Sequence, residues 1–110
     1  MKHDDQIRIR HMLDSARELL SFVAGVERES FVQNRLLVLA VIKELEIIGE
    51  AASKVSPETR KEHAEIPWQD VVGMRNRLIH GYFDIDLERV WDTVSGDVPE
   101  LVILLEQSLV

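Results

Sequence analysis

Apolar residues recur along most of the chain at the three- and four-residue steps of an α-helix, and this pattern predicts an all-helical protein. The first apolar face near the N-terminus runs through Ile9, Leu13, Ala16, Leu20 and Val23. Asp4 or Asp5 is expected to cap this helix, and Gly25 lies near its end. The first element is therefore predicted to be a single amphipathic helix.

A second helix is expected to run from a capping box at Ser30 and Gln33 to about Val55. Its middle, from Leu36 to Ile48, is apolar on almost every side. A helix with this pattern is buried on more than one face. We therefore expect one face to pack in the core of the chain and another to pack against a second chain.

Small residues follow this apolar stretch. Gly49, Ala51 and Ala52 form a patch that another backbone can approach closely, and Glu50 stands among them. Two interpretations of Glu50 remain open at this point. Its side chain either lies on the solvent side of the helix or is buried with a cationic partner.

Helix-start and helix-stop residues delimit the next two elements. Ser56 and Pro57 begin a short helix that reaches about His63. Pro67 begins the following helix, which Gly81 can end in a left-handed turn.

The last third of the chain is also expected to be helical. Asp86 caps a helix through Val94, which Ser95-Gly96 interrupts, and Asp97 with Glu100 opens the last amphipathic helix. We see no strand pair with hairpin turns. The predicted fold class is all-α, an up-and-down bundle of four to five helices in a single domain, residues 1–110.

Composition and charge narrow the possible functions. The net charge of −7 argues against a long nucleic-acid-binding surface, so any chemistry on nucleic acid must use a local basic pocket. The absence of cysteine excludes disulfides and thiolate chemistry. The longest apolar run, Leu36 to Ile42, is far shorter than the roughly 20 residues of a membrane span. With no signal-type segment at the start, a cytoplasmic protein is expected.

The candidate chemical site is the segment 75–82. It places five polar side chains close together between apolar stretches: Arg75, Asn76, Arg77, His80 and Tyr82. Arg75 and His80 are about 140° apart on an ideal helix, so they converge only if the arginine reaches round or a second chain supplies one of them. The helix dipole favours a charged His80 and the neighbouring arginines oppose it, which leaves the direction of its pKa shift open.

These residue types suit metal-free cleavage of a phosphodiester. A histidine can take a proton from a ribose 2′-hydroxyl or give one to the leaving oxygen. An arginine can bind the phosphate and stabilise the charge that builds on it. Asparagine can orient the histidine, and tyrosine can position the ribose or stack on a base.

The spacing Arg75-x4-His80-x-Tyr82 resembles the R-x4-H-x-Y motif of the HEPN superfamily, with Asn76 as the polar residue that often follows the arginine. The surrounding sequence resembles the HepT family over nearly the whole chain. The stretches that carry this resemblance are Ile47–Ala52, Pro67-Trp68, Gly73–Asn76, Leu78–Phe83 and Asp86–Trp91.

The resemblance implies a helical HEPN-like fold that forms a two-fold homodimer, with the motifs of both chains lining one cleft. It implies a metal-independent endoribonuclease toxin without a cofactor, in which Arg75 and His80 are catalytic and Asn76, Arg77 and Tyr82 support them. It also implies an antitoxin partner, a minimal nucleotidyltransferase of the MntA type, that silences the toxin by attaching AMP to Tyr82. The AMP phosphate is expected to pair with both Arg75 and Arg77.

Two other classes of function compete with the ribonuclease. A non-catalytic HEPN subunit could bind nucleotides or act as a scaffold for a nucleotidyltransferase, which the acidic net charge favours. A purely structural helical protein would use Trp68 and Trp91 as core or interface anchors. His3 and His11 share a helix face, but no further metal ligand is spaced near them. The carboxylates of Glu44, Glu46 and Glu50 are expected to be surface charges or partners of Arg75 and Arg77, not acid–base catalysts.

Overall fold

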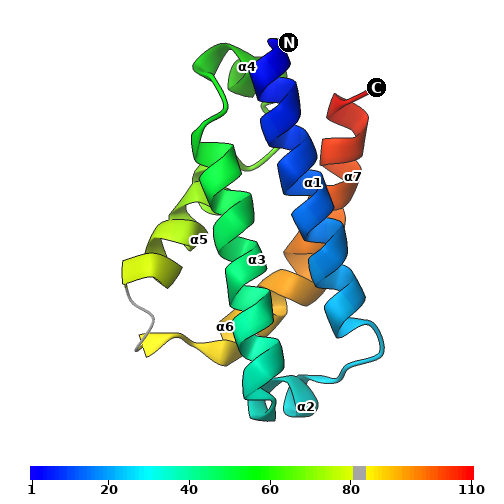
Figure 1. Ribbon diagram of the computed structural model, residues 1–110, viewed down its shortest axis with the longest axis vertical. Coiled ribbons are helices and arrows are strands. Elements are labelled where there is room, and N and C mark those ends of the chain that lie inside the picture. Colours follow the sequence, from blue (N-terminus) through cyan, green and yellow to red (C-terminus); the bar gives the residue numbers. More distant parts are fainter. Residues whose placement is uncertain (81–83) are drawn as a thin grey trace.

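The computed structural model describes residues 1–80, with His80 by its backbone alone, and residues 84–110. All regular elements in these ranges are helices (Figure 1). The long helices are α1 (His3–Val23), α3 (Arg35–Ser53), α5 (Trp68–His80) and α7 (Val98–Ser108), and the short ones are α2 (Arg28–Gln33), α4 (Pro57–Glu62), α6 (Leu87–Asp92) and the π-helical turn η2 (Thr93–Asp97). The prediction of an all-α fold is confirmed, although the described residues form four long and four short helical elements, more than the four to five helices expected.

Helix α3 is the centre of the arrangement, because it packs against α1 on one side and α5 on the other. Helices α1 and α3 run in opposite directions along the long axis, and α7 returns beside α1, so that both termini lie at the same end (Figure 1). Helix α6 and η2 lead the chain from the region of α5 back to α7. This order places α5 on the outside of the bundle, supported by α3.

The core forms along the facing sides of α1, α3 and α7. The fully buried stripe of α1 is Ile9, Met12, Ala16 and Leu19. The predicted positions Ile9, Leu13 and Ala16 are confirmed as buried, whereas Leu20 and Val23 are only partly buried. Met12 and Leu19 are buried in addition, because α1 packs against both α3 and α7 and its buried face is wider than one stripe.

The helix predicted from Ser30 to Val55 is interrupted, which corrects the expectation of one continuous element. Asn34 has an extended backbone, and its side chain accepts a hydrogen bond from the Leu37 amide at 3.1 Å, so it is the N-cap of α3. The predicted capping box at Ser30 and Gln33 lies inside the separate helix α2. The break lets Phe31 turn inward, where its ring packs 5.2 Å from that of Trp91.

The prediction that Ser95-Gly96 interrupts the helix is also wrong. Helix α6 continues without a break through η2 into α7, with wider π-helical turns over Thr93–Asp97. Asp97 makes no side-chain cap hydrogen bond, so the expected capping box with Glu100 does not form. By contrast, the predicted caps are confirmed at Ser56, which accepts from the Thr59 amide, and at Asp86, which accepts from the amides of Glu88 and Arg89.

The apolar surface of α3 is divided along its length. Val41 and Ile48 are buried within the core of the chain, whereas Leu36 and Leu39 are 81% and 49% exposed. The surplus of apolar residues predicted for this helix therefore lies at its N-terminal end.

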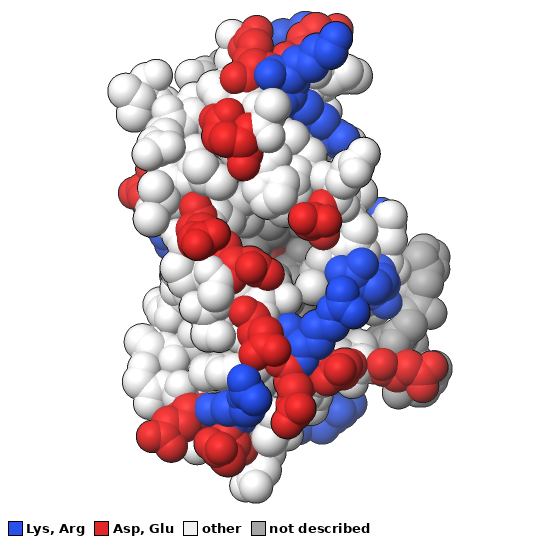
Figure 2. Space-filling view, turned by 180° about the vertical axis from the view of Figure 1, so that it is seen from behind, with Lys and Arg blue, Asp and Glu red and all other residues white. Residues whose placement is uncertain are grey.

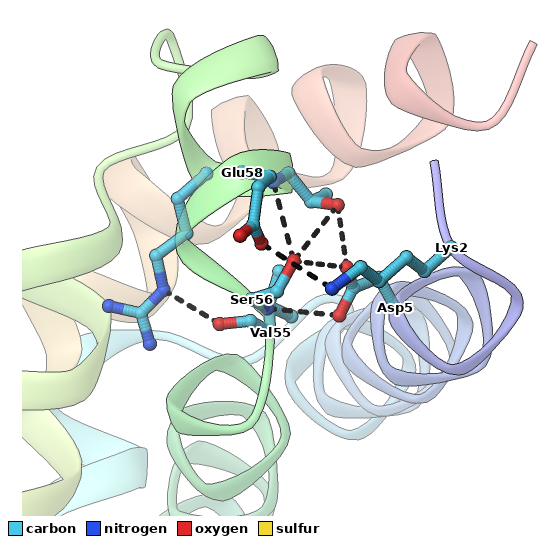
Figure 3. Close-up of polar contacts among 7 residues, drawn as sticks. Lys2, Asp5, Val55, Ser56 and Glu58 are labelled. Atoms are coloured by element: carbon cyan, nitrogen blue, oxygen red, sulfur yellow. Dashed lines mark hydrogen bonds and ion pairs between the residues drawn. The ribbon is translucent and has the colours of Figure 1, made fainter.

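A polar cluster joins the start of α1 to the start of α4 (Figure 3). Asp5 is buried and accepts hydrogen bonds from the Ser56 amide at 2.9 Å, from the Ser56 hydroxyl and from the Thr59 hydroxyl at 2.6 Å. Asp5 therefore does not cap α1 as expected; the N-cap position is Lys2, which makes no side-chain cap bond. Burial acts to raise the pKa of Asp5, but these hydrogen bonds and the charge of Lys2 hold it below its ordinary value.

In the described part of the chain, the hydrophobic helices are all too short or too often interrupted by charges to cross a membrane.

Candidate functional site around Arg75

Helix α5 approaches α3 most closely at Gly49. A Cβ atom at this position would overlap the Cβ of Arg75, and it would lie 2.8 Å from the Arg75 Cγ and 3.1 Å from the Val71 carbonyl oxygen. Only a residue without a side chain fits here. Gly49 therefore fixes the register in which Arg75 meets α3, and the prediction of a close backbone approach at this small-residue patch is confirmed.

Arg75 is held by two partners. Its Nη2 donates to the carboxylate of Glu50, and its Nη1 donates to the Asn76 side-chain oxygen at 3.0 Å. The Nε atom is buried and has no partner, and 28% of the side chain remains exposed. Glu50 thus has a cationic partner, but its side chain is 45% exposed, so the interpretation as a buried and paired carboxylate is confirmed only in the pairing. Its other carboxylate oxygen lies 3.4 Å from the Lys54 ammonium group.

The guanidinium of Arg75 lines a groove between α1, α3 and α5, with a volume of about 500 Å³. The charged walls of the groove are formed by Arg8, Asp14, Lys43, Glu46, Glu50 and Lys54. Cationic side chains outnumber anionic ones here, although the chain as a whole carries a net charge of −7. With one cation in excess the groove is weakly basic, which is less than the concentrated basic pocket expected from the sequence.

Arg77 lies elsewhere. It lines two other hollows, one shared with Arg89 and Asp97 between α5 and α7, and one shared with Asn76 and Asp86. Within one chain the structure therefore does not bring Arg75 and Arg77 into a common pocket. The expectation that one phosphate group pairs with both is not supported within a single chain.

His80 is the last residue of α5, so its backbone is in the helix predicted for it. Its side chain, Tyr82 and the C-terminal turn predicted at Gly81 lie outside the described residues. The separation of the predicted catalytic pair, Arg75 and His80, by about 140° around the helix thus stays a prediction from ideal helix geometry.

A second buried carboxylate lies on α3. Glu44 is 5% exposed, and its Oε2 has no hydrogen-bond partner. Burial and the neighbouring carboxylate of Glu18 raise its pKa to about 7, against a hydrogen bond with Ser15 that lowers it. The expectation that Glu44 is a surface charge or an arginine partner is wrong, since its polar neighbours come from α1.

Charges on the surface are mixed. On the face drawn in Figure 2, Asp and Glu side chains are spread from end to end and Lys and Arg side chains lie among them. No continuous basic track crosses the described residues of this face. A nucleic acid would therefore be bound at a local site and not along an extended surface.

Sequence reasoning missed the contribution of α1 to the groove. Arg8 and His11 line the same wall, and their three-residue spacing already placed them on one helix face. The signal was present, but nothing in the sequence showed that this face meets α5. The alternative of a metal site at His3 and His11 finds no cluster of three ligands among the described residues.

Comparisons with known proteins agree on one family. A model of the family described as "Ribonuclease HepT-like" matches residues 12–108. A protein of Caldanaerobacter subterraneus named "Putative RNase TTE0752" is 38% identical over 93 residues, which cover 84% of this chain and 83% of the relative. "Putative RNase MJ1380" of Methanocaldococcus jannaschii is 37% identical, covering 91% and 92% of the two chains.

A third relative, "Probable ribonuclease HepT" of Thermococcus cleftensis, is 34% identical over 92% of each chain. No solved structure matches this chain. The family match covers most of the chain and the relatives exceed 30% identity over most of their length. The chain therefore belongs to the HepT-like ribonuclease family.

Proposed function

We propose that this chain is an endoribonuclease that cleaves RNA without a metal ion, with Arg75 and His80 as its catalytic pair. The observation that carries the proposal is the position of Arg75 at a groove that is locally basic. A guanidinium has five N–H donors, and the bonds to Glu50 and Asn76 leave one N–H on each terminal nitrogen for a phosphate. The ribonuclease names of the relatives support the same activity here.

The reaction follows from these groups. His80 accepts the proton of a ribose 2′-hydroxyl, and the 2′-oxygen attacks the adjacent phosphorus. The bond from phosphorus to the 5′-oxygen breaks, and that oxygen takes a proton from a protonated histidine, which is His80 after the first transfer or its counterpart in the second chain. The products are a 2′,3′-cyclic phosphate and a 5′-hydroxyl end. Arg75 binds the phosphate oxygens and stabilises the negative charge that develops on them.

A two-fold dimer is part of the proposal. Arg75 and His80 are about 140° apart on an ideal helix, so a second chain brings their counterparts together more readily than one helix does. The exposed Leu36 and Leu39 supply apolar surface for such a contact. Light scattering at micromolar concentration measures this directly, and a monomer mass would exclude the two-chain site.

We also propose that the protein is the toxin of a pair whose antitoxin is a minimal nucleotidyltransferase, and that AMP attached to Tyr82 silences it. The bulk and negative charge of AMP two residues from His80 would keep an RNA phosphate out of the site. Mass spectrometry of the chain co-expressed with a minimal nucleotidyltransferase tests this. Neutralisation by AMP transfer that persists in Tyr82→Phe would contradict it.

The activity test compares four proteins on RNA in the presence of EDTA: the natural chain, Arg75→Ala, His80→Ala and, as a matched control, the exposed His3→Ala. We expect the natural chain and the control to cleave, and the two site variants to lose at least about 100-fold in rate. Cleavage by His80→Ala at the natural rate would contradict the catalytic assignment. Binding of RNA or nucleotide without cleavage by any of the proteins would favour a non-catalytic subunit.

A further inference from the structure

Two consecutive residues of α3 hold Arg75 in place at the groove. Its Cβ packs against the bare backbone of Gly49, and its Nη2 donates to the carboxylate of the next residue, Glu50. Two consecutive residues of α3 thus act on one side chain of α5, the first by allowing the approach and the second by binding the guanidinium. The same carboxylate also contacts Lys54, one turn further along α3.

We infer that Glu50 is a positioning residue for the proposed ribonuclease, which holds the Arg75 guanidinium in the orientation that binds the scissile phosphate. The inference rests on the proposed function only for its catalytic consequence. The unpartnered, buried Nε leaves Asn76 and Glu50 as the described groups that fix the plane of the guanidinium. Of these, Glu50 is the charged partner and comes from a different helix, so it ties the arginine to the bundle.

The negative charge of Glu50 allows a role in positioning Arg75 to be distinguished from a role in binding RNA. Glu50 contributes a negative charge to a groove that is proposed to receive phosphate, so its carboxylate opposes substrate binding while it orders Arg75. Removing the charge of Glu50 should therefore affect KM and kcat differently. RNA should bind as well or better, while the bound phosphate meets a less ordered arginine.

The experiment compares Glu50→Gln with Glu46→Gln. Both changes remove one carboxylate from the same groove, but the ion pair of Glu46 is with Lys43 and not with Arg75. We expect Glu50→Gln to lower kcat by about 10- to 100-fold with KM unchanged or reduced, because small displacements of a catalytic group have effects of this size. Glu46→Gln removes a like charge from the groove and should shift KM in the same direction, so the difference in kcat between the two variants measures the contact with Arg75.

A second measurement does not depend on activity. The Arg75 Nε–H is buried, so its NMR signal should be protected from solvent exchange, and rotation of the guanidinium should be slow in the natural chain. Both features should persist in Glu46→Gln and be lost in Glu50→Gln. Melting curves show whether each variant remains folded.

The outcomes separate the two proposals. If the natural chain cleaves RNA and Glu50→Gln has the same kcat, the positioning role is wrong. If kcat falls only together with the melting temperature and a higher KM, Glu50 is structural. If no protein cleaves RNA, the proposed function fails, and equal guanidinium signals in both variants would then overturn the positioning role independently.

Discussion

Two polar sites join helices in this protein, and they differ in how many of their hydrogen-bonding groups have partners. At the Asp5 cluster, three donors from the start of α4 converge on one carboxylate, and the residue is buried. At Arg75, Glu50 and Asn76 bind the guanidinium from one side, and 28% of the side chain remains open to a groove. A closed polar site stabilises the fold, whereas a site held in place with donors left over can bind a ligand.

The largest effect on stability is expected at Gly49, where α3 and α5 approach each other beside Arg75. Gly49→Ala should lower the free energy of unfolding by about 3 to 4 kcal/mol, at the upper end of overpacking penalties, because the added methyl overlaps Arg75. It should also abolish RNA cleavage, since α5 must move away from Glu50. Thermal unfolding and a cleavage assay measure the two effects.

Gly73→Ala is the matched control for this change. A methyl group there meets only the flexible end of Arg77, at 3.7 Å, and alanine favours the helix by about 0.5 to 1 kcal/mol. This variant should therefore be slightly more stable than the natural chain. A similar loss of stability in both glycine variants would show that the close approach at Gly49 is not the cause.

The closed site is tested by Asp5→Asn, which keeps the shape of the side chain but replaces an acceptor by a donor. We expect a loss of about 2 to 3 kcal/mol at neutral pH, because donors of Ser56 and Thr59 are left without a full set of acceptors. RNA cleavage should be unchanged under conditions where the variant is folded. Urea unfolding of this variant and of the exposed Asp4→Asn supplies the comparison.

The pH dependence of the Asp5 effect has a definite sign. The pKa of Asp5 in the folded state lies below its ordinary value of 3.8, so its contribution is fully present well above pH 3.8 and is lost as the pH falls through the folded-state value. The difference between the natural chain and Asp5→Asn should shrink in acid. A difference that stays constant down to pH 2 would exclude the charged carboxylate as its source.

Local signals in the sequence predicted the helices better than the contacts between them. Ser56 and Asp86 cap their helices as expected, because a cap depends on residues only two or three positions away. Asn34 is also a residue type that favours the N-cap, but the capping-box spacing of Ser30 and Gln33 favours an earlier helix start. The π-helical turn replaced a predicted break, since packing of Val94 and Val98 in the core favours a continuous helix.

The candidate site was predictable only in part for the same reason. The spacing of Arg75 and His80 showed which residues to consider, and the patch around Gly49 showed that a backbone would come close. Glu50 was one of three carboxylates expected as surface charges or arginine partners, and its pairing with Arg75, 25 residues away in sequence, depends on the register between α3 and α5, which periodicity does not encode. The burial of Asp5 and Glu44 depends in the same way on neighbouring helices.

Glu44 is buried like Asp5, but one of its carboxylate oxygens has no hydrogen-bond partner. It therefore lies between the closed and the open site, and a change there is expected to have the smallest effect on stability. Its pKa is raised from 4.5 to about 7, so the folded state holds a proton that the unfolded state releases between these values. Stability should therefore fall as the pH rises through this window. Glu44→Gln removes the cost of the buried charge and should stabilise the protein by about 1 to 2 kcal/mol at pH 8.

Glu46→Gln is the control on the same helix, since Glu46 is less buried and contacts Lys43. The gain from Glu44→Gln, measured by urea unfolding at a series of pH values, should shrink as the pH falls from 7 and disappear well below pH 4.5, where Glu44 is protonated in both states. A gain that persists in acid would mean that the amide packs better than the acid, and that the missing hydrogen bond, not the charge, makes Glu44 the weak point of α3. A loss of stability at pH 8 would show that the Glu44 carboxylate is as well satisfied as that of Asp5.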